Sequence, residues 1–187
     1  MCIDSEKIKK AVTMLIEAIG ENPKREGLKD TPLRVAKMYK EFFAGYNDNV
    51  LDHIDVVFHE NYHDIVFLKK IPFFSICEHH LIPFIGFANI CYLPKDGCIL
   101  GLSKIVRILH SVSKRLQLQE RITATVADII MENLKPQGVI VCLEAEHMCM
   151  AIRGVKSFGT KTITKAVKGI FSSNDVLRKE AFSFFKA

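Results

Sequence analysis

One stretch of this sequence reads Phe74-Ser75-Ile76-Cys77-Glu78-His79-His80-Leu81-Ile82-Pro83-Phe84. It places a thiol, a carboxylate and two imidazoles side by side, with apolar residues on both flanks. Polar groups are costly to bury without strong partners, and a metal ion is a natural partner for cysteine and histidine. Residues that could complete such a site lie far along the chain, at His147-Met148-Cys149. The sequence therefore predicts a fold that brings these two segments together.

The composition is typical of a globular protein. Of the 187 residues, 49% are hydrophobic and 25% are charged, which is too apolar for a disordered chain and fits one domain with a helical appendage. No apolar run approaches the ~20 residues that span a bilayer, so no membrane partner is expected. The N-terminal residues lack the pattern of a secretory signal. The six scattered cysteines then indicate reduced thiols and a cytoplasmic location.

The charge pattern argues against a nucleic-acid partner. The formal net charge is +5, and the basic residues occur in short separate groups. Tryptophan is absent, and no aromatic residues alternate with the basic groups as they do where bases are stacked. A small anionic substrate fits this charge equally well.

Hydrophobic spacing divides the chain into a helical start and a mixed remainder. Apolar residues recur at helical intervals within residues 4–20 and 31–45. Later segments alternate between short β-branched or aromatic runs and helical patterns. We expect strands at 54–58, 64–68, 85–93 and 139–150, and helices at 103–116, 122–134 and about 174–185. Separate helices and antiparallel strands predict an α+β fold, with an N-terminal helical segment over residues 1–50 and a second region over residues 51–187.

The cysteines and histidines suggest a metal centre. In a strand-to-turn geometry Cys77 and His80 can point to one place, with Cys149 as the third ligand. Two thiolates and one imidazole suit Zn²⁺, and three protein ligands leave a position for a water molecule whose pKa falls to about 7. His79 and His147 would then be proton carriers. On an extended strand, His147 and Cys149 would project from the same face. Two alternatives stay open: a structural zinc with His79 or His147 as its fourth ligand, and no metal at all.

Other polar groups could bind an anion or a purine. Ser103, Lys104 and Arg107 lie at the start of an expected helix, where free N–H groups attract anions, and Arg153 follows the metal segment. An ordinary capped helix with exposed charges is the alternative. Gln119 and Glu120 fall in an expected connection between helices, where a carboxylate could accept two hydrogen bonds from a guanine edge. The basic face of the second helix, which includes Arg34 and Lys37, is expected to be solvated.

Several separated motifs together resemble one family, GTP cyclohydrolase I, over about residues 27–185. The motifs in order are Asp30-Thr31-Pro32 with Arg34-Val35-Ala36-Lys37-Met38, Ser75-Ile76-Cys77-Glu78-His79-His80, Gly101-Leu102-Ser103-Lys104, Gln117-Leu118-Gln119-Glu120-Arg121-Ile122-Thr123, and Glu144-Ala145-Glu146-His147-Met148-Cys149-Met150 with Arg153-Gly154.

The resemblance implies roles for particular residues. Cys77, His80 and Cys149 would hold one Zn²⁺ per subunit, and His79 and His147 would be the catalytic histidines. Glu120, with Gln119 beside it, would hold the guanine ring. The residues around the ribose and triphosphate would be Ser103, Lys104, Arg107 and Arg153, joined by Arg34 and Lys37 from a neighbouring subunit.

The resemblance also implies a reaction and an assembly. GTP and water would become 7,8-dihydroneopterin triphosphate and formate, the first step of tetrahydrofolate and pterin biosynthesis, with His147 protonating N7 of the purine. The fold would be the tunnelling fold, an antiparallel sheet with packed helices whose barrel is completed by oligomerisation. The assembly would be a homodecamer of two stacked pentamers with active sites between subunits. Two other classes remain: a zinc module that binds nucleotide or protein without hydrolysis, and a related tunnelling-fold enzyme with a cysteine nucleophile.

Overall fold

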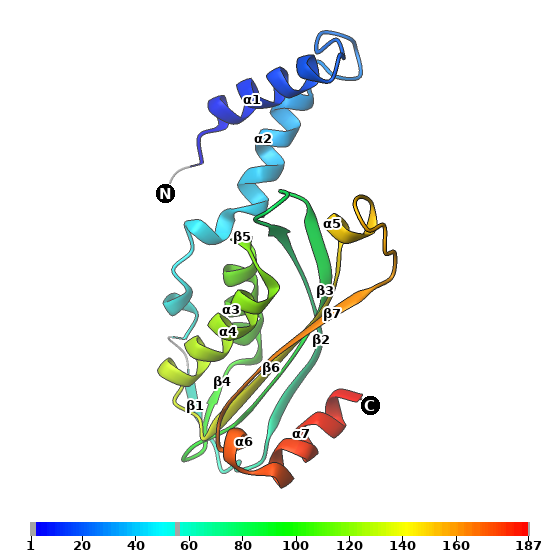
Figure 1. The fold of residues 1–187 in the computed structure, drawn as a ribbon. Helices are drawn as coiled ribbons and strands as arrows, with labels where there is room; N and C mark the ends of the chain where they lie inside the picture. The colour runs from blue at the N-terminus through cyan, green and yellow to red at the C-terminus, as the bar shows by residue number, and fades with distance from the viewer. Residues whose placement is uncertain (1–2, 55–56, 187) are drawn as a thin grey trace.

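The computed structural model describes residues 3–54 and 57–186, and it begins with two helices that stand clear of the sheet (Figure 1). Helix α1 spans Ser5–Ala18, and α2 spans Thr31–Phe42. The carboxylate of Asp4 accepts hydrogen bonds from the backbone N–H groups of Glu6 and Lys7, which caps α1. Two short 3₁₀ helices, η1 (Ala44–Tyr46) and η2 (Val50–His53), lead toward the sheet. The division of the chain near residue 50 stays a prediction.

A five-stranded sheet forms the centre of the molecule, in the order β5-β2-β3-β6-β7. Its strands are β2 (Val66–Cys77), β3 (Pro83–Leu93), β5 (Leu116–Gln117), β6 (Gly138–His147) and β7 (Lys161–Gly169). All neighbours are antiparallel except β5, which pairs parallel with the end of β2. A separate pair joins β1 (Val57–His59) to β4 (Cys98–Leu100). The register of β3 and β6 sets Phe84 opposite His147 and so brings the two predicted site segments together.

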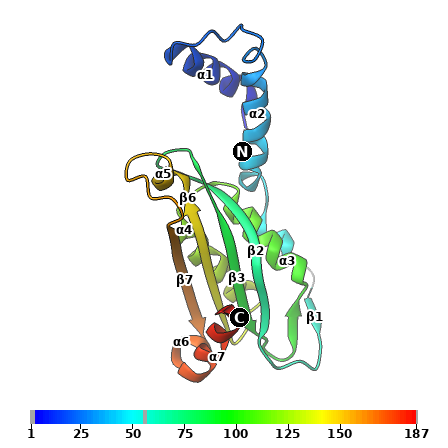
Figure 2. The same ribbon diagram turned by 90° about the vertical axis from the view of Figure 1, so that its right-hand side faces the viewer.

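Helices cover the two faces of the sheet unequally. Helices α3 (Leu102–Ser113) and α4 (Gln119–Asn133) pack on one face and bury the main core. On the other face, α6 (Ile170–Ser173) and α7 (Asp175–Lys186) cover one end only (Figure 2). Along β3, Phe84, Ala88 and Tyr92 face the main core, whereas Cys91 and Leu93 face the smaller cluster beneath α7. This period-2 alternation is what a sheet covered on both faces requires.

The α+β class is confirmed, and several local expectations need correction. Strand β6 ends at His147, and Cys149 lies on a short helix, α5 (Met148–Ala151), so His147 and Cys149 do not share the face of one strand. The helix expected from residue 103 begins at Leu102 with its N-cap at Gly101, so Ser103 is its second residue. Gln119 and Glu120 form the first turn of α4 rather than a connection.

Strand β7 was not expected from the sequence at all. Its burial alternates between exposed and half-buried positions, and three lysines interrupt its apolar pattern. The expected strand at 54–58 falls partly on residues 55 and 56, which lie outside the described residues. Among the helices that the structure describes, none is long and apolar enough to cross a lipid bilayer.

Candidate functional site

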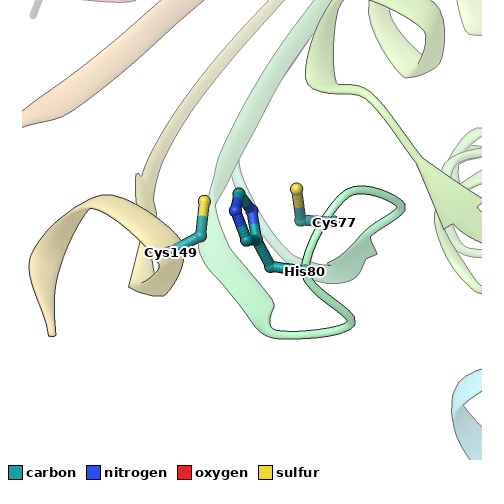
Figure 3. A group of neighbouring side chains, drawn as sticks. All are labelled: Cys77, His80 and Cys149. Carbon is teal, nitrogen blue, oxygen red and sulfur yellow. The ribbon is translucent and has the colours of Figure 1, made fainter. Parts of the chain in front are cut away.

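Three potential metal ligands converge at one end of the sheet. Strand β2 ends at Cys77, and a tight turn follows in which the N–H of Leu81 donates to the carbonyl of Cys77 at 2.9 Å. This turn carries His80, and α5 brings Cys149 from the far side of β3 (Figure 3). The donor atoms of Cys77, His80 and Cys149 all lie within 4.8 Å of one another. The fold therefore brings together the three residues that the sequence predicts as metal ligands.

The three donors form a soft site that is open on one side. Cys77 is buried, Cys149 is half-buried and His80 is exposed. Burial, followed by the proximity of Cys77, raises the pKa of the Cys149 thiol. Two sulfurs and one imidazole are a donor set that suits Zn²⁺. Within the described residues this group has three members, and neither His79 nor His147 joins it as a fourth donor.

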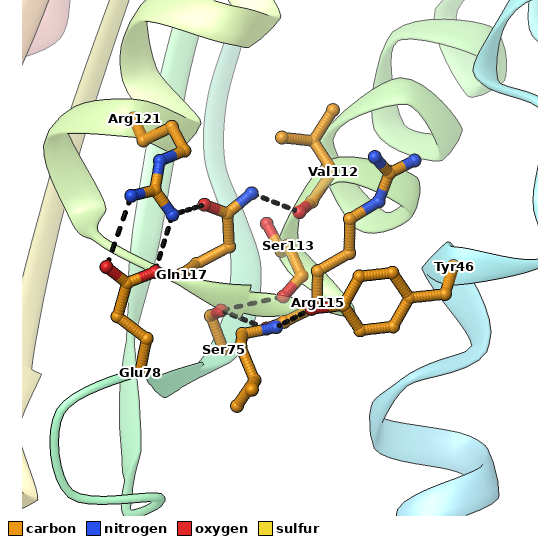
Figure 4. Close-up of polar contacts among 9 residues, drawn as sticks. Tyr46, Ser75, Glu78, Val112, Ser113, Arg115, Gln117 and Arg121 are labelled. Carbon is orange, nitrogen blue, oxygen red and sulfur yellow. Dashed lines mark hydrogen bonds and ion pairs between the residues drawn. The ribbon is translucent and has the colours of Figure 1, made fainter. Parts of the chain in front are cut away.

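The turn that carries His80 is held against α4 by an ion pair. The carboxylate of Glu78 accepts hydrogen bonds from both terminal nitrogens of Arg121, at 2.6 Å and 3.2 Å (Figure 4). This hydrogen bonding is the largest cause of the lowered pKa of Glu78. The N–H of Glu78 also donates to the carbonyl of Gln117 in β5, at 3.2 Å. Charge-assisted bidentate pairs of this kind fix geometry as well as adding energy.

His147 lies beside the three donors and is held from two directions. Its ring stacks on Phe84, with centroids 4.5 Å apart and planes 5° from parallel. Its Nε2 lies 2.8 Å from Oε1 of Gln119. Burial lowers the pKa of His147, and the nearby charge of Glu120 opposes this shift. The proximity of Glu120 to His147 places the first turn of α4 at the same end of the sheet.

Two more predicted residues, His79 and Arg153, border the metal group. The guanidinium of Arg153 donates from Nη1 to Nε2 of His80 at 2.6 Å. The rings of His79 and His80 meet edge to face, with centroids 6.4 Å apart. A cationic side chain at this place is suited to an anionic ligand that approaches the metal group.

The remaining predicted residues lie elsewhere in this chain. Ser103, Lys104 and Arg107 are in the first half of α3, whereas the carbonyl of Ser113 at the end of α3 accepts a hydrogen bond from Ser75 of β2. At 1.5 Å per residue, Ser103 lies about 15 Å along the helix from that end. The other two, Arg34 and Lys37, are on α2, and Arg34 forms an ion pair with Asp30 at 3.6 Å. One chain thus presents the predicted site in three separate parts, at the metal end of the sheet, on α3 and on α2.

Sequence reasoning assigned Glu78 a structural role beside the metal group, but it missed the contacts that support the site. The stacking of Phe84 on His147 follows from the register of β3 with β6, and no local pattern announces it. The pair between Glu78 and Arg121 joins positions 43 residues apart. Both partners do occur within the quoted motifs, and their opposite charges were the only available signal.

Fold and site together define a class: an α+β protein whose antiparallel sheet carries an open Cys₂His candidate metal group beside a half-buried histidine. Comparison with known sequences narrows this class. The sequence profile of the GTP cyclohydrolase I family matches residues 8–186, and the chain belongs to that family. Its fold is therefore the tunnelling fold of that family, in agreement with the observed sheet and helices.

Individual relatives agree over nearly their whole length. The chain is 56% identical to "GTP cyclohydrolase 1" of Listeria monocytogenes serotype 4b (strain F2365), over 98% of this chain and 97% of the relative. It is 55% identical to the protein of the same name from Halalkalibacterium halodurans, over 98% of both chains. Among solved structures, the apo form of the archaeosine synthase QueF-Like has a TM-score of 0.47 at 18% identity, and covers 58% of this chain and 97% of its own. That structural likeness is too slight to carry an argument.

Proposed function

We propose that this protein is a hydrolase of cyclic amidine C–N bonds that converts GTP and water to 7,8-dihydroneopterin triphosphate and formate. The observation that carries the proposal is the convergence of Cys77, His80 and Cys149 beside His147, in a chain that belongs to the GTP cyclohydrolase I family. This reaction is the first step of tetrahydrofolate and pterin biosynthesis, and we place it in the cytoplasm.

We propose Zn²⁺ as the metal, with one ion per subunit. Cys77, His80 and Cys149 would hold it, because two thiolates and one imidazole are typical zinc ligands and three donors leave one position open. A zinc ion in such a site acts as a Lewis acid and makes a hydrolytic nucleophile available at neutral pH. Arg121, through Glu78, would keep the turn that carries His80 in the orientation that the metal needs.

The other residues would bind the substrate and move protons. His147 would give a proton to N7 of the purine, which promotes attack at C8 and opening of the imidazole ring. Glu120 would accept hydrogen bonds from the guanine edge, with Gln119 beside it. His79 and Ser103 would assist proton transfers while the ribose opens and closes onto the exposed amine. Such general acid–base steps require a group within hydrogen-bond reach of the proton it moves.

A complete site would need more than one subunit. The triphosphate residues Ser103, Lys104, Arg107 and Arg153, with Arg34 and Lys37, are divided between the metal end of the sheet, α3 and α2. We propose that the first half of α3 in one subunit meets the metal end of another, and that α2 supplies Arg34 and Lys37 across a second interface.

The surface of the sheet supports this assembly. Within the described residues β7 pairs with β6 alone, and β5 covers only the last two residues of the outer edge of β2. Open strand edges invite pairing with another chain. On the face opposite α3, Ile85, Phe87 and Ile163 are 55%, 47% and 63% exposed. A barrel closed by copies of this chain, as two stacked pentamers, would cover these edges.

GTP turnover is the direct test of the proposed function. Zinc-loaded protein should release formate and a fluorescent pterin in equal amounts, chelation should stop both, and zinc with a reductant should restore both. Binding of GTP without product by folded, zinc-loaded protein would instead indicate a nucleotide-binding zinc module and would refute the proposal.

A further inference from the structure

The side-chain amide of Gln119 has one possible orientation. It is 1% exposed, and its Nε2 lies 3.1 Å from the carbonyl oxygen of Leu143 in β6 and 3.0 Å from that of Thr162 in β7. Backbone carbonyl oxygens only accept hydrogen bonds, so the NH₂ group must face them. The reverse orientation would bury the amide oxygen against two carbonyl oxygens, where neither side has a proton to donate.

A chain of hydroxyl groups supports the same orientation. The hydroxyl of Thr123 donates to the backbone carbonyl of Gln119 at 2.8 Å, so it must accept from Thr164, whose Oγ1 is 2.6 Å away. Thr164 then uses its only proton on Thr123 and is left with acceptor capacity toward Gln119, at 3.1 Å. The group of Gln119 that faces Thr164 is therefore a donor, which again identifies it as NH₂.

This orientation determines where His147 carries a proton. Oε1 of Gln119 lies 2.8 Å from Nε2 of His147, and an amide oxygen has no proton to give. Nε2 must therefore bear hydrogen in both the neutral and the charged ring. In the neutral ring Nδ1 is then unprotonated, and within residues 3–54 and 57–186 it has no hydrogen-bond partner. The second ring nitrogen is the only one left to exchange a proton with a ligand.

We propose that Gln119 is a positioning residue that holds His147 as its Nε2–H tautomer, so that Nδ1 is the nitrogen that exchanges a proton with the substrate. This inference rests on the proposed function. In the step concerned, the N–H bond at Nδ1 breaks, a bond forms between that proton and N7 of the purine, and the imidazolium becomes a neutral ring. The hydrogen on Nε2 stays in its bond to Gln119 throughout. The stacked ring of Phe84 holds the plane of the imidazole while this happens.

A positioning role differs measurably from a direct contact between Gln119 and guanine. A base-binding side chain contributes to the binding of GTP, so that its loss raises KM. A residue that acts only through His147 changes the proton transfer, so that its loss lowers kcat and leaves KM nearly unchanged. Direct binding of guanine by Gln119 therefore predicts a change in KM, whereas positioning of His147 predicts a change in kcat.

The tautomer of His147 can be measured directly in the wild-type protein. Zinc-loaded wild-type protein with ¹⁵N-labelled histidine should be studied by solid-state NMR at a pH of about 8.5, above the usual pKa of histidine. The signals of His147 are those that disappear in His147→Gln. We expect a protonated Nε2 and an unprotonated Nδ1. A protonated Nδ1 with a bare Nε2 would overturn the inference, whatever the activity.

Two substitutions distinguish the hydrogen bond that Gln119 makes to His147 from the hydrogen bonds that it makes to the sheet. Gln119→Leu and Gln119→Glu both lose the NH₂ donors to Leu143 and Thr162, but only the glutamate keeps an acceptor for His147. We expect kcat to fall about 100-fold in Gln119→Leu and only about tenfold in Gln119→Glu, with KM for GTP within about threefold of wild type in both. Zinc content and oligomer size show that each variant is assembled.

The outcomes also distinguish this inference from the proposed function. Equal losses of kcat in both variants, or a raised KM with unchanged kcat, would contradict the role of Gln119 while wild-type turnover stands. Wild-type protein that makes no pterin would refute the proposed function itself.

Discussion

The carboxylate of Glu78 lies against the guanidinium of Arg121, with one oxygen 2.6 Å from Nη1 and the other 3.2 Å from Nη2. This pair connects the turn between β2 and β3 to the first turns of α4. The turn carries His80, and the start of α4 carries Gln119 and Glu120. One ion pair thus connects the metal ligand to the part of the chain that faces His147.

Loss of this pair should weaken metal binding more than it weakens the fold. In Glu78→Gln the turn loses its charged anchor while keeping its shape, and we expect about tenfold weaker Zn²⁺ binding, measured by competition with a chromogenic chelator. Asp175→Asn is the matched control, because it removes an i,i+3 ion pair with Arg178 in α7, away from the metal group. Equal zinc affinity in Glu78→Gln and wild type would contradict the anchoring role.

Aerobic removal of the metal should inactivate the protein through its thiols. The sulfurs of Cys77 and Cys149 lie within 4.8 Å of each other, close enough to form a disulfide after small movements once no metal separates them. We expect peptides that contain Cys77 and Cys149 to be cross-linked in non-reducing mass spectrometry, and activity to return only with reductant and zinc together.

Cys91 is the internal control for this oxidation. Burial raises the pKa of its thiol to about 12, so it has almost no thiolate at neutral pH and should stay reduced. A sample handled without oxygen should recover with zinc alone. Full recovery of the aerobic sample on zinc without reductant would show that the disulfide does not form.

Sites shared between subunits should permit complementation. Cys149→Ala removes the metal group of one chain, and Lys104→Ala removes a proposed triphosphate contact on α3 of another. Each variant alone should be inactive. In oligomers reassembled from an equal mixture, about a quarter of the sites would combine two intact halves, and activity should return to about that fraction. Mixtures without activity, despite mixed oligomers by native mass spectrometry, would indicate that each site belongs to one chain.

Gly86 should be intolerant of even a methyl group. A Cβ at this position would lie 1.9 Å from the carbonyl oxygen of Glu144 and 2.6 Å from Cα of Ala145, so β3 and β6 would have to separate. We expect Gly86→Ala to lower the free energy of unfolding by about 2–3 kcal/mol in urea titrations and to disturb the neighbouring pair of Phe84 and His147.

Gly154→Ala is the comparison for this substitution. Its φ is +59°, and no heavy atom lies within 4 Å of an added Cβ, so only backbone strain of about 1 kcal/mol applies. Equal destabilisation of the two variants would mean that contact with β6 does not limit position 86.

Much of the architecture was predictable from short stretches of sequence. The helices α1, α2 and α7 follow from apolar residues at helical intervals, and such patterns depend only on neighbours in the chain. Strand β7 escaped prediction because three lysines interrupt its apolar pattern, and its extended form depends on hydrogen bonds to β6. Helix α5 escaped for a similar reason: His147-Met148-Cys149 continues an apolar run, and the chain turns only beside the first residues of β3.

The candidate site, like the fold, could be predicted from the sequence only in part. By itself the sequence determined which residues are chemically able to bind a metal, because thiols and imidazoles are ligands wherever they occur. Only the tertiary structure decided that Cys149 reaches Cys77 and His80 from a helix, and that Ser103 lies a helix length away. It also decided that the amide of Gln119 points its oxygen at His147. These relationships depend on the register of β3, β6 and β7 and on buried hydrogen bonds between distant residues, which no local pattern of sequence contains.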